Sequence, residues 1–160
     1  IIPVPVILMI IVFILGILFL QKTRFGTYIY GIGGNEEASR LSGINTKRIK
    51  YIFYGVCSAL AALAGVVLLA RVNSGQPKSG DGYEMDVITA CVLGGVSISG
   101  GEGKLSFVIF GVLLMGVLSN GLIMNNVSDY WQQAISGLVL IAAVAFDRLM
   151  QHLKAKQLQS

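Results

Sequence analysis

Residues 1–20 read IIPVPVILMIIVFILGILFL and contain no charged side chain. Three further stretches of similar length are also uncharged, at 51–70, 105–124 and 130–146. About 20 apolar residues in a helix cross the ~30 Å of bilayer hydrocarbon, and a charge near its centre costs at least ~2.5 kcal/mol. The 160 residues are 54% hydrophobic and only 12% charged, against roughly 25% charge in soluble domains. The sequence therefore predicts an all-α transmembrane helical bundle.

One more uncharged segment, residues 87–101, is shorter than the others. As a helix it would be ~22 Å long, which is less than the thickness of the hydrocarbon. It contains glycines and serines at Gly94, Gly95, Gly100, Gly101, Ser97 and Ser99. Such a segment is either an interrupted span beside a transport pathway or a short tilted helix packed through its glycines. When residues 87–101 are counted as a span, the chain is predicted to cross the membrane about five times, with one crossing short and broken by glycine.

The placement of Lys and Arg indicates the orientation. With five crossings, residues 21–50, 100–104 and 147–160 share one side of the membrane and carry ten of the twelve Lys and Arg residues. Basic residues accumulate in cytoplasmic loops, so this side is predicted to be the cytoplasm. A re-entrant 87–101 would instead divide the basic residues equally. We therefore expect a cytoplasmic C-terminus and an N-terminal end outside, and the basic residues give no reason to expect a nucleic-acid partner.

The chain begins with Ile1 inside an apolar stretch, with no basic region or cleavage site before it. This start does not have the pattern of a signal peptide. We therefore expect the sequence to be a piece of a longer membrane protein.

The polar loop 21–50 contains the string GIGGNEEASRLSGIN at residues 31–45. Asn35 is a favourable N-cap, and Gly43 suits the C-terminal end of a helix. Two acidic residues occupy the first turn, where they complement the helix dipole: Glu36 and Glu37. The pattern predicts a helix over 36–42, followed by a second helix that Asn45 or Thr46 begins.

A seven-residue helix is not stable alone in water, because even 12–15 residues are marginal. Some other surface must therefore support residues 36–42. The support is either the rest of the bundle and the lipid headgroups, or a cytoplasmic partner on which the helix docks.

Three stretches carry a resemblance to a known family: GIGGNEEASRLSGIN, then SGQPKSGDGYEMDVITACVLGGVSISGGEGKLSFVIFGVLLMGVLSNGL at 74–122, and DYWQQAISGLVLIAAVAFD at 129–147. In this order they resemble the permease subunits of bacterial ABC sugar importers, the ribose-type family. The resemblance covers nearly all 160 residues and implies the C-terminal half of one transmembrane permease domain. Ser39 departs from the E-A-A pattern of the family, and Phe107 stands where a small residue is expected.

The resemblance implies that the short helix is a coupling helix, which sits in a cleft of a separate cytoplasmic ATP-binding subunit. The residues implied in this contact are Gly34, Asn35, Glu36, Glu37, Ala38, Ser39, Arg40, Leu41 and Gly43. It further implies a second permease subunit, forming a homodimer, and a periplasmic substrate-binding protein. The resemblance implies that the assembly of these subunits imports a ribose-like monosaccharide across the bacterial inner membrane, with lipid around the spans.

The residues do not indicate an enzyme, a cofactor or a metal site. His152 is the only histidine, and it lies in the polar tail. The string GGEGKL differs from a phosphate-binding loop, because Ile98 and Leu105 replace the required Gly and Ser or Thr. We therefore expect ATP to be hydrolysed by a separate partner.

Candidates for the transport pathway are the polar and small residues of the spans, Gly94, Gly95, Ser97 and Asn120. An Asn side chain both donates and accepts hydrogen bonds, as recognition of a sugar requires. Polar residues in spans also bond neighbouring helices, with about 0.6 kcal/mol on average, so the alternative for Asn120 is helix packing.

Three alternative functions differ from a sugar importer. The first is an ABC permease of the branched-chain amino acid type. The second is half of an ion-coupled secondary carrier, which would require ionisable residues inside the membrane, and the predicted spans contain none. The third is a structural membrane subunit without transport activity.

Overall fold

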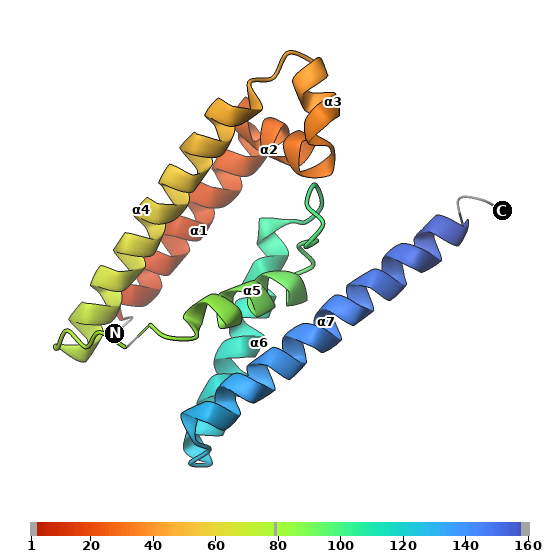
Figure 1. Cartoon of the computed structure of the whole chain (residues 1–160). Coiled ribbons are helices and arrows are strands. Elements are labelled where there is room, and N and C mark those ends of the chain that lie inside the picture. The colour runs from red at the N-terminus through yellow and green to blue at the C-terminus, as the bar shows by residue number, and fades with distance from the viewer. Residues whose placement is uncertain (1–2, 79, 158–160) are drawn as a thin grey trace. The chain divides into compact units, whose positions relative to one another are not determined.

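The computed structural model describes residues 3–78 and 80–157, which form helices connected by turns (Figure 1). No strand occurs within these residues. Four of the helices are long and apolar enough to cross a membrane, within α1, α4, α6 and α7. This confirms the predicted all-α transmembrane class. The helices are α1 (Val4–Lys22), α2 (Arg24–Gly34), α3 (Glu36–Leu41), α4 (Thr46–Val72), α5 (Tyr83–Leu93), α6 (Leu105–Met124) and α7 (Asp129–Gln157).

The chain divides into two compact units, an N-terminal unit of residues 1–80 and a C-terminal unit of residues 81–160. In the N-terminal unit, α1 and α4 are the long helices, and α2 and α3 connect them (Figure 1). The most apolar windows of α1 and α4 contain no buried residue within the structure. Side chains that are apolar and uncovered over such a window suit a lipid environment.

A tight turn joins α1 to α2. The Thr23 hydroxyl donates a 2.6 Å hydrogen bond to the Phe19 carbonyl and accepts one from the Gly26 amide, so it stabilises the end of one helix and the start of the next. Gly26 is buried, and a Cβ there would collide with the backbone of Leu20. The rings of Phe19 and Phe25 stack across the turn with centroids 6.1 Å apart.

In the C-terminal unit, α5 packs against both α6 and α7. The contact with α6 is made by glycines. A Cβ at Gly94 would lie 2.5 Å from the Cα of Val108, and one at Gly111 would overlap the carbonyl oxygen of Ala90. The two backbones therefore touch, a contact that larger residues would prevent.

Helix bounds differ from the sequence prediction in three places. The sequence does not predict α2, which lies inside the loop 21–50. Helix α7 continues through the predicted tail to Gln157, whereas α4 begins at Thr46 with Asn45 as its N-cap, as predicted. At 29 residues, α7 is ~43 Å long, so it exceeds the thickness of the hydrocarbon. Helix α5 starts before residue 87.

The short uncharged segment forms α5, an 11-residue helix, followed by turns from Gly94 to the start of α6. A helix of 11 residues is ~16 Å long, which is about half of the hydrocarbon thickness. The segment is short and broken by glycine, as expected. That it completes a fifth crossing stays a prediction.

Candidate functional site

The short helix α3 has a defined start and a defined end. At the start, the Asn35 Oδ1 atom accepts a 2.9 Å hydrogen bond from the Ala38 amide. At the end, the Gly43 amide donates to the Arg40 carbonyl and the Ile44 amide donates to the Ser39 carbonyl, at 3.0 and 3.1 Å. Gly43 has a φ of +83°, which glycine adopts without steric cost. The two hydrogen bonds at the end form a Schellman motif. Helix α3 begins at the predicted residue, Glu36, and ends one residue earlier than predicted, at Leu41.

Residues of the same chain support the inner side of α3. Ser39 is only 7% exposed, and its Oγ donates a 2.9 Å hydrogen bond to the Asn35 carbonyl. A Cβ at Gly31 of α2 would lie 3.4 Å from this Oγ, so the absence of a side chain at Gly31 allows α2 and α3 to approach. In α4, Thr46 and Ile49 are buried. Helix α3 therefore lies against both α2 and α4, the support that a helix of six residues needs.

An ion pair joins α3 to α4. The Lys50 ammonium group donates to the Glu36 Oε2 atom at 2.6 Å, and both side chains are nearly half exposed. The hydrogen bond and the positive charge of Lys50 lower the pKa of the Glu36 carboxyl, with smaller contributions in the same direction from Thr46 and Arg40. Glu36 is therefore ionised at neutral pH, and the ion pair persists there.

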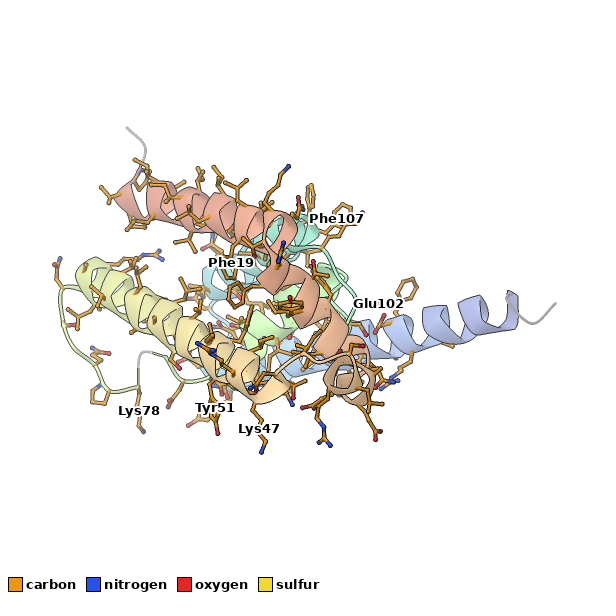
Figure 2. The ribbon with its side chains drawn as sticks, turned by 90° about the horizontal axis from the view of Figure 1, so that it is seen from above. Phe19, Lys47, Tyr51, Lys78, Glu102 and Phe107 are labelled. Atoms are coloured by element: carbon orange, nitrogen blue, oxygen red, sulfur yellow. The ribbon has the colours of Figure 1, made fainter. Side chains whose placement is uncertain are left out.

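The outer side of α3 faces away from the rest of the unit. Leu41 is 84% exposed, on a helix that lies in a polar loop rather than in a span. Next to it is an open depression of about 680 Å³, lined by Glu36, Glu37, Arg40, Gly43, Ile44, Asn45, Thr46 and Lys47. Lys47 projects outward from the first turn of α4 (Figure 2). The depression therefore combines both signs of charge with an apolar residue, which suits contact with a polar protein surface.

The structure places the nine predicted coupling residues on one continuous segment, from the end of α2 through α3 to its closing turn. Their orientations differ. Ser39 faces inward and supports α3, whereas Glu37, Ala38, Arg40 and Leu41 are exposed. Gly34 has open space around it, and Gly43 shapes the turn. The surface available to a partner is therefore narrower than the predicted set.

The structure separates Asn120 from the other three predicted pathway residues, which lie together in the turn after α5. Gly94 packs against the backbone of α6, and Gly95 ends α5 with a φ of +79°. The Ser97 amide donates to the Glu102 carbonyl at 3.0 Å within the following turn. Asn120 is exposed on α6, 12 residues beyond the Val108 contact with Gly94, or ~18 Å along the helix. The glycines thus have structural roles, and the set does not form one cluster.

Lys50 and Thr46 are site residues that the sequence interpretation does not include. A signal for them existed, because Asn45 as N-cap places both on the same face of α4, one turn apart. Among the described residues, no group of three or more His, Cys, Asp or Glu side chains could hold a metal ion.

Comparison with known proteins identifies the family. The sequence profile for the permease component of branched-chain amino acid transport systems matches residues 1–144. The chain belongs to this family. With four helices able to span a membrane, this family member is a multi-pass membrane protein. No solved structure matches it.

Three of the proteins similar to this chain are named as sugar permeases. The ribose import permease of Escherichia coli K12 is 47% identical over 150 residues, which cover 94% of this chain and 47% of that protein. The L-arabinose transport system permease of the same strain is 45% identical over 152 residues, covering 95% and 46%. The xylose transport system permease of Haemophilus influenzae is 42% identical over 146 residues, covering 91% and 39%. The chain spans about half the length of the curated relatives it matches. The resemblance to ribose-type permeases is confirmed.

Proposed function

We propose that this chain forms part of the membrane-spanning subunit of an ATP-driven importer, and that α3 docks on a separate ATP-binding subunit in the cytoplasm. The observation that carries the proposal is the exposed outer side of α3. The chain continues from α3 through a short turn into the spanning helix α4. Leu41 is 84% exposed beside a depression of mixed charge. A partner that covers Leu41 removes its apolar surface from water, which favours association.

Monosaccharides of the ribose type are the proposed substrates. The relatives with 42–47% identity are named for ribose, L-arabinose and xylose. The family description names branched-chain amino acids instead, so a permease of that type is the alternative. Uptake of labelled ribose that an excess of leucine does not reduce would support the sugar. Competition by leucine would support the alternative.

The proposed assembly contains two copies of the permease, the ATP-binding subunits and a periplasmic substrate-binding protein, in the bacterial inner membrane. The predicted N-terminal end lies outside and the predicted C-terminal end in the cytoplasm, because ten of the twelve Lys and Arg residues then face the cytoplasm. A cysteine at Leu41 should react with an impermeant thiol reagent only from the cytoplasm, and one at Lys78 only from outside. Labelling of both from one side contradicts this topology.

The proposed pathway includes Gly94, Gly95, Ser97 and Asn120, with the first three acting through the shape of the turn after α5. Asn120 is the member whose side chain can bond a sugar hydroxyl. Asn120→Ala should raise the KM for sugar uptake without lowering the amount of protein in the membrane. A change in protein amount alone would assign Asn120 to helix packing.

The docking of α3 is tested by Leu41→Ser and Glu37→Lys. Both positions are exposed, so neither change removes a contact inside the unit. We expect about a tenfold loss of the ATP-binding subunit on co-purification, because Leu41→Ser removes apolar area from the proposed contact and Glu37→Lys reverses a charge in it. Leu41→Met is the matched control and should retain the partner. Unchanged co-purification with both variants contradicts docking through α3.

ATP as the energy source is tested separately. Uptake by the importer should stop when ATP is depleted and continue when a protonophore removes the ion gradient. The reverse result would favour the ion-coupled carrier.

A further inference from the structure

The connection between α3 and α4 is a chain of four residues, 42–45, in which Gly43 has a positive φ. This connection joins only the C-terminal end of α3 to α4, while Asn35 joins the N-terminal end of α3 to α2. Relative to α4, α3 is covalently attached at one end and can pivot about that end. Motion imposed on α3 would then change the angle of the turn without moving α4.

The ion pair between Glu36 and Lys50 attaches the opposite end of α3. Glu36 is the first residue of α3, and Lys50 lies one turn beyond Thr46 in α4. The nitrogen and oxygen atoms are 2.6 Å apart, a short charge-assisted hydrogen bond. The sequence separation of 14 residues makes this a contact between helices and not within one.

A local alternative to this contact exists in the sequence. Arg40 lies four residues after Glu36, and a Glu followed by a basic residue at this spacing forms a favourable pair along one helix. The Glu36 carboxylate nevertheless bonds Lys50 of α4. The buried hydroxyl of Thr46 lies on the same face of α4 and contributes to the lowered pKa of Glu36. The geometry therefore directs Glu36 across to the neighbouring helix.

We infer that Glu36 and Lys50 are positioning residues that make α3 and α4 move as one rigid body. With the covalent link at one end of α3 and the ion pair at the other, a displacement of docked α3 is passed to α4 without pivoting at Gly43. Rigid-body movement of packed helices is a common form of switching motion. The inference rests on the proposed function, because it concerns how a docked α3 moves a spanning helix.

The experiment measures sugar transported per ATP hydrolysed in the assembled transporter, together with co-purification of the ATP-binding subunit. The variants are Glu36→Gln, Lys50→Gln and the charge exchange Glu36→Lys with Lys50→Glu. Arg48→Gln is the matched control, since it removes one positive charge from the same turn of α4 and leaves the ion pair intact. Lys50→Arg is the conservative variant.

Each single neutral variant should lower the transport-to-hydrolysis ratio by about two- to fivefold, the range expected for an exposed ion pair. With Lys50→Gln, whose side chain does not line the depression beside α3, co-purification should stay at the level of the unchanged protein. The charge exchange and Lys50→Arg should recover the ratio, and Arg48→Gln should not alter it. A role in folding alone would also be recovered by charge exchange, so the amount of protein in the membrane is measured independently and should be the same for every variant.

Two results would overturn the inference. An unchanged ratio in both neutral variants would show that the ion pair does not transmit motion. Loss of the ATP-binding subunit from Glu36→Gln, without recovery on charge exchange, would assign Glu36 to the partner surface. The proposed function fails in a different way, when Leu41→Ser and Glu37→Lys leave co-purification unchanged, so the two failures are distinguishable.

Discussion

The long helices α1 and α4 of the N-terminal unit carry no buried residue in their most apolar windows, whereas α5 and α6 of the C-terminal unit touch at the backbone through Gly94 and Gly111. In the N-terminal unit the contacts that join elements lie at helix ends, and they include the ion pair between Glu36 and Lys50 and the close contact of Gly26 with Leu20. A close-packed contact tolerates little change, because displaced backbones lose their partners. A polar contact at a helix end depends instead on a few named atoms, so one substitution can remove it. The comparison indicates that α5 and α6 are held together by backbone packing, whereas α3 and α4 are held together in part by a single ion pair.

The largest expected effect comes from a side chain in the close contact of the C-terminal unit. Gly111→Leu should cost about 3 kcal/mol or more, because the added carbons overlap the Ala90 carbonyl and force α5 away from α6. Thermal unfolding in detergent measures this as a lower melting temperature. Gly116→Leu on the same helix is the control, since open space surrounds Gly116. Equal stability of the two variants would contradict the close contact.

The closing turn of α3 should be the next most sensitive position. Gly43→Ala should cost about 1–2 kcal/mol, because a Cβ is unfavourable at a φ of +83°. Hydrogen exchange of the Ile44 amide, which bonds the Ser39 carbonyl, should accelerate about tenfold. Gly34→Ala serves as the control because it lies inside α2 with open space around it. Acceleration in both variants alike would argue against a specific role of the turn.

The start of α3 should respond less. Asn35→Ala removes the acceptor of the Ala38 amide and should cost about 1 kcal/mol, with roughly fivefold faster exchange of that amide. Asn35→Asp keeps an acceptor oxygen and should behave like the unchanged protein. If Asn35→Asp exchanged as fast as Asn35→Ala, the cap would not be the cause.

Titration of Glu36 should have the smallest effect. Lys50 lowers the pKa of this carboxyl in the folded protein. A carboxyl with a lowered folded pKa stabilises the fold above its unfolded pKa, and the contribution is lost as the pH falls through the folded value. The contact should therefore be intact at neutral pH and be lost only below about pH 4.3, the ordinary value for glutamate. Amide exchange in α3, corrected for its intrinsic rate, should be constant between about pH 7 and pH 5.5.

A loss of protection of α3 between about pH 7 and pH 5.5 would contradict a lowered pKa of Glu36. The variant Glu36→Gln is the control for this titration, because it lacks the carboxyl and should show no further change at more acidic pH.

Sequence patterns predict α3 well and α2 poorly, for physical reasons. The cap at Asn35 and the glycine at Gly43 act on their immediate neighbours, so their effect is visible in a few consecutive residues. Helix α2 contains four glycines among 11 residues, which lowers its intrinsic helix propensity. It forms because Gly26 and Gly31 allow close approach to Leu20 and Ser39. That compensation depends on residues of other elements.

The candidate site shows the same division. The resemblance places Glu36 and Leu41 in one segment, and that segment is exposed apart from Ser39. The inward orientation of Ser39 cannot be predicted from the amino-acid sequence, because a helix of six residues is too short to show a periodic pattern of apolar residues. The role of Gly94 and Gly111 is also hidden, since most glycines in spans look alike until two backbones meet.

Amino-acid order alone is enough to establish a multi-pass helical membrane protein, the approximate places of its four long helices, and the two ends of α3. The reason is that span length, charge placement and helix capping depend on consecutive residues. The pairing of Glu36 with Lys50 and the backbone contact of α5 with α6 follow only from the folded arrangement. Each of these two contacts joins residues that are 14 or more positions apart in the sequence. The packing of the helices decides which of the possible partner residues come into contact.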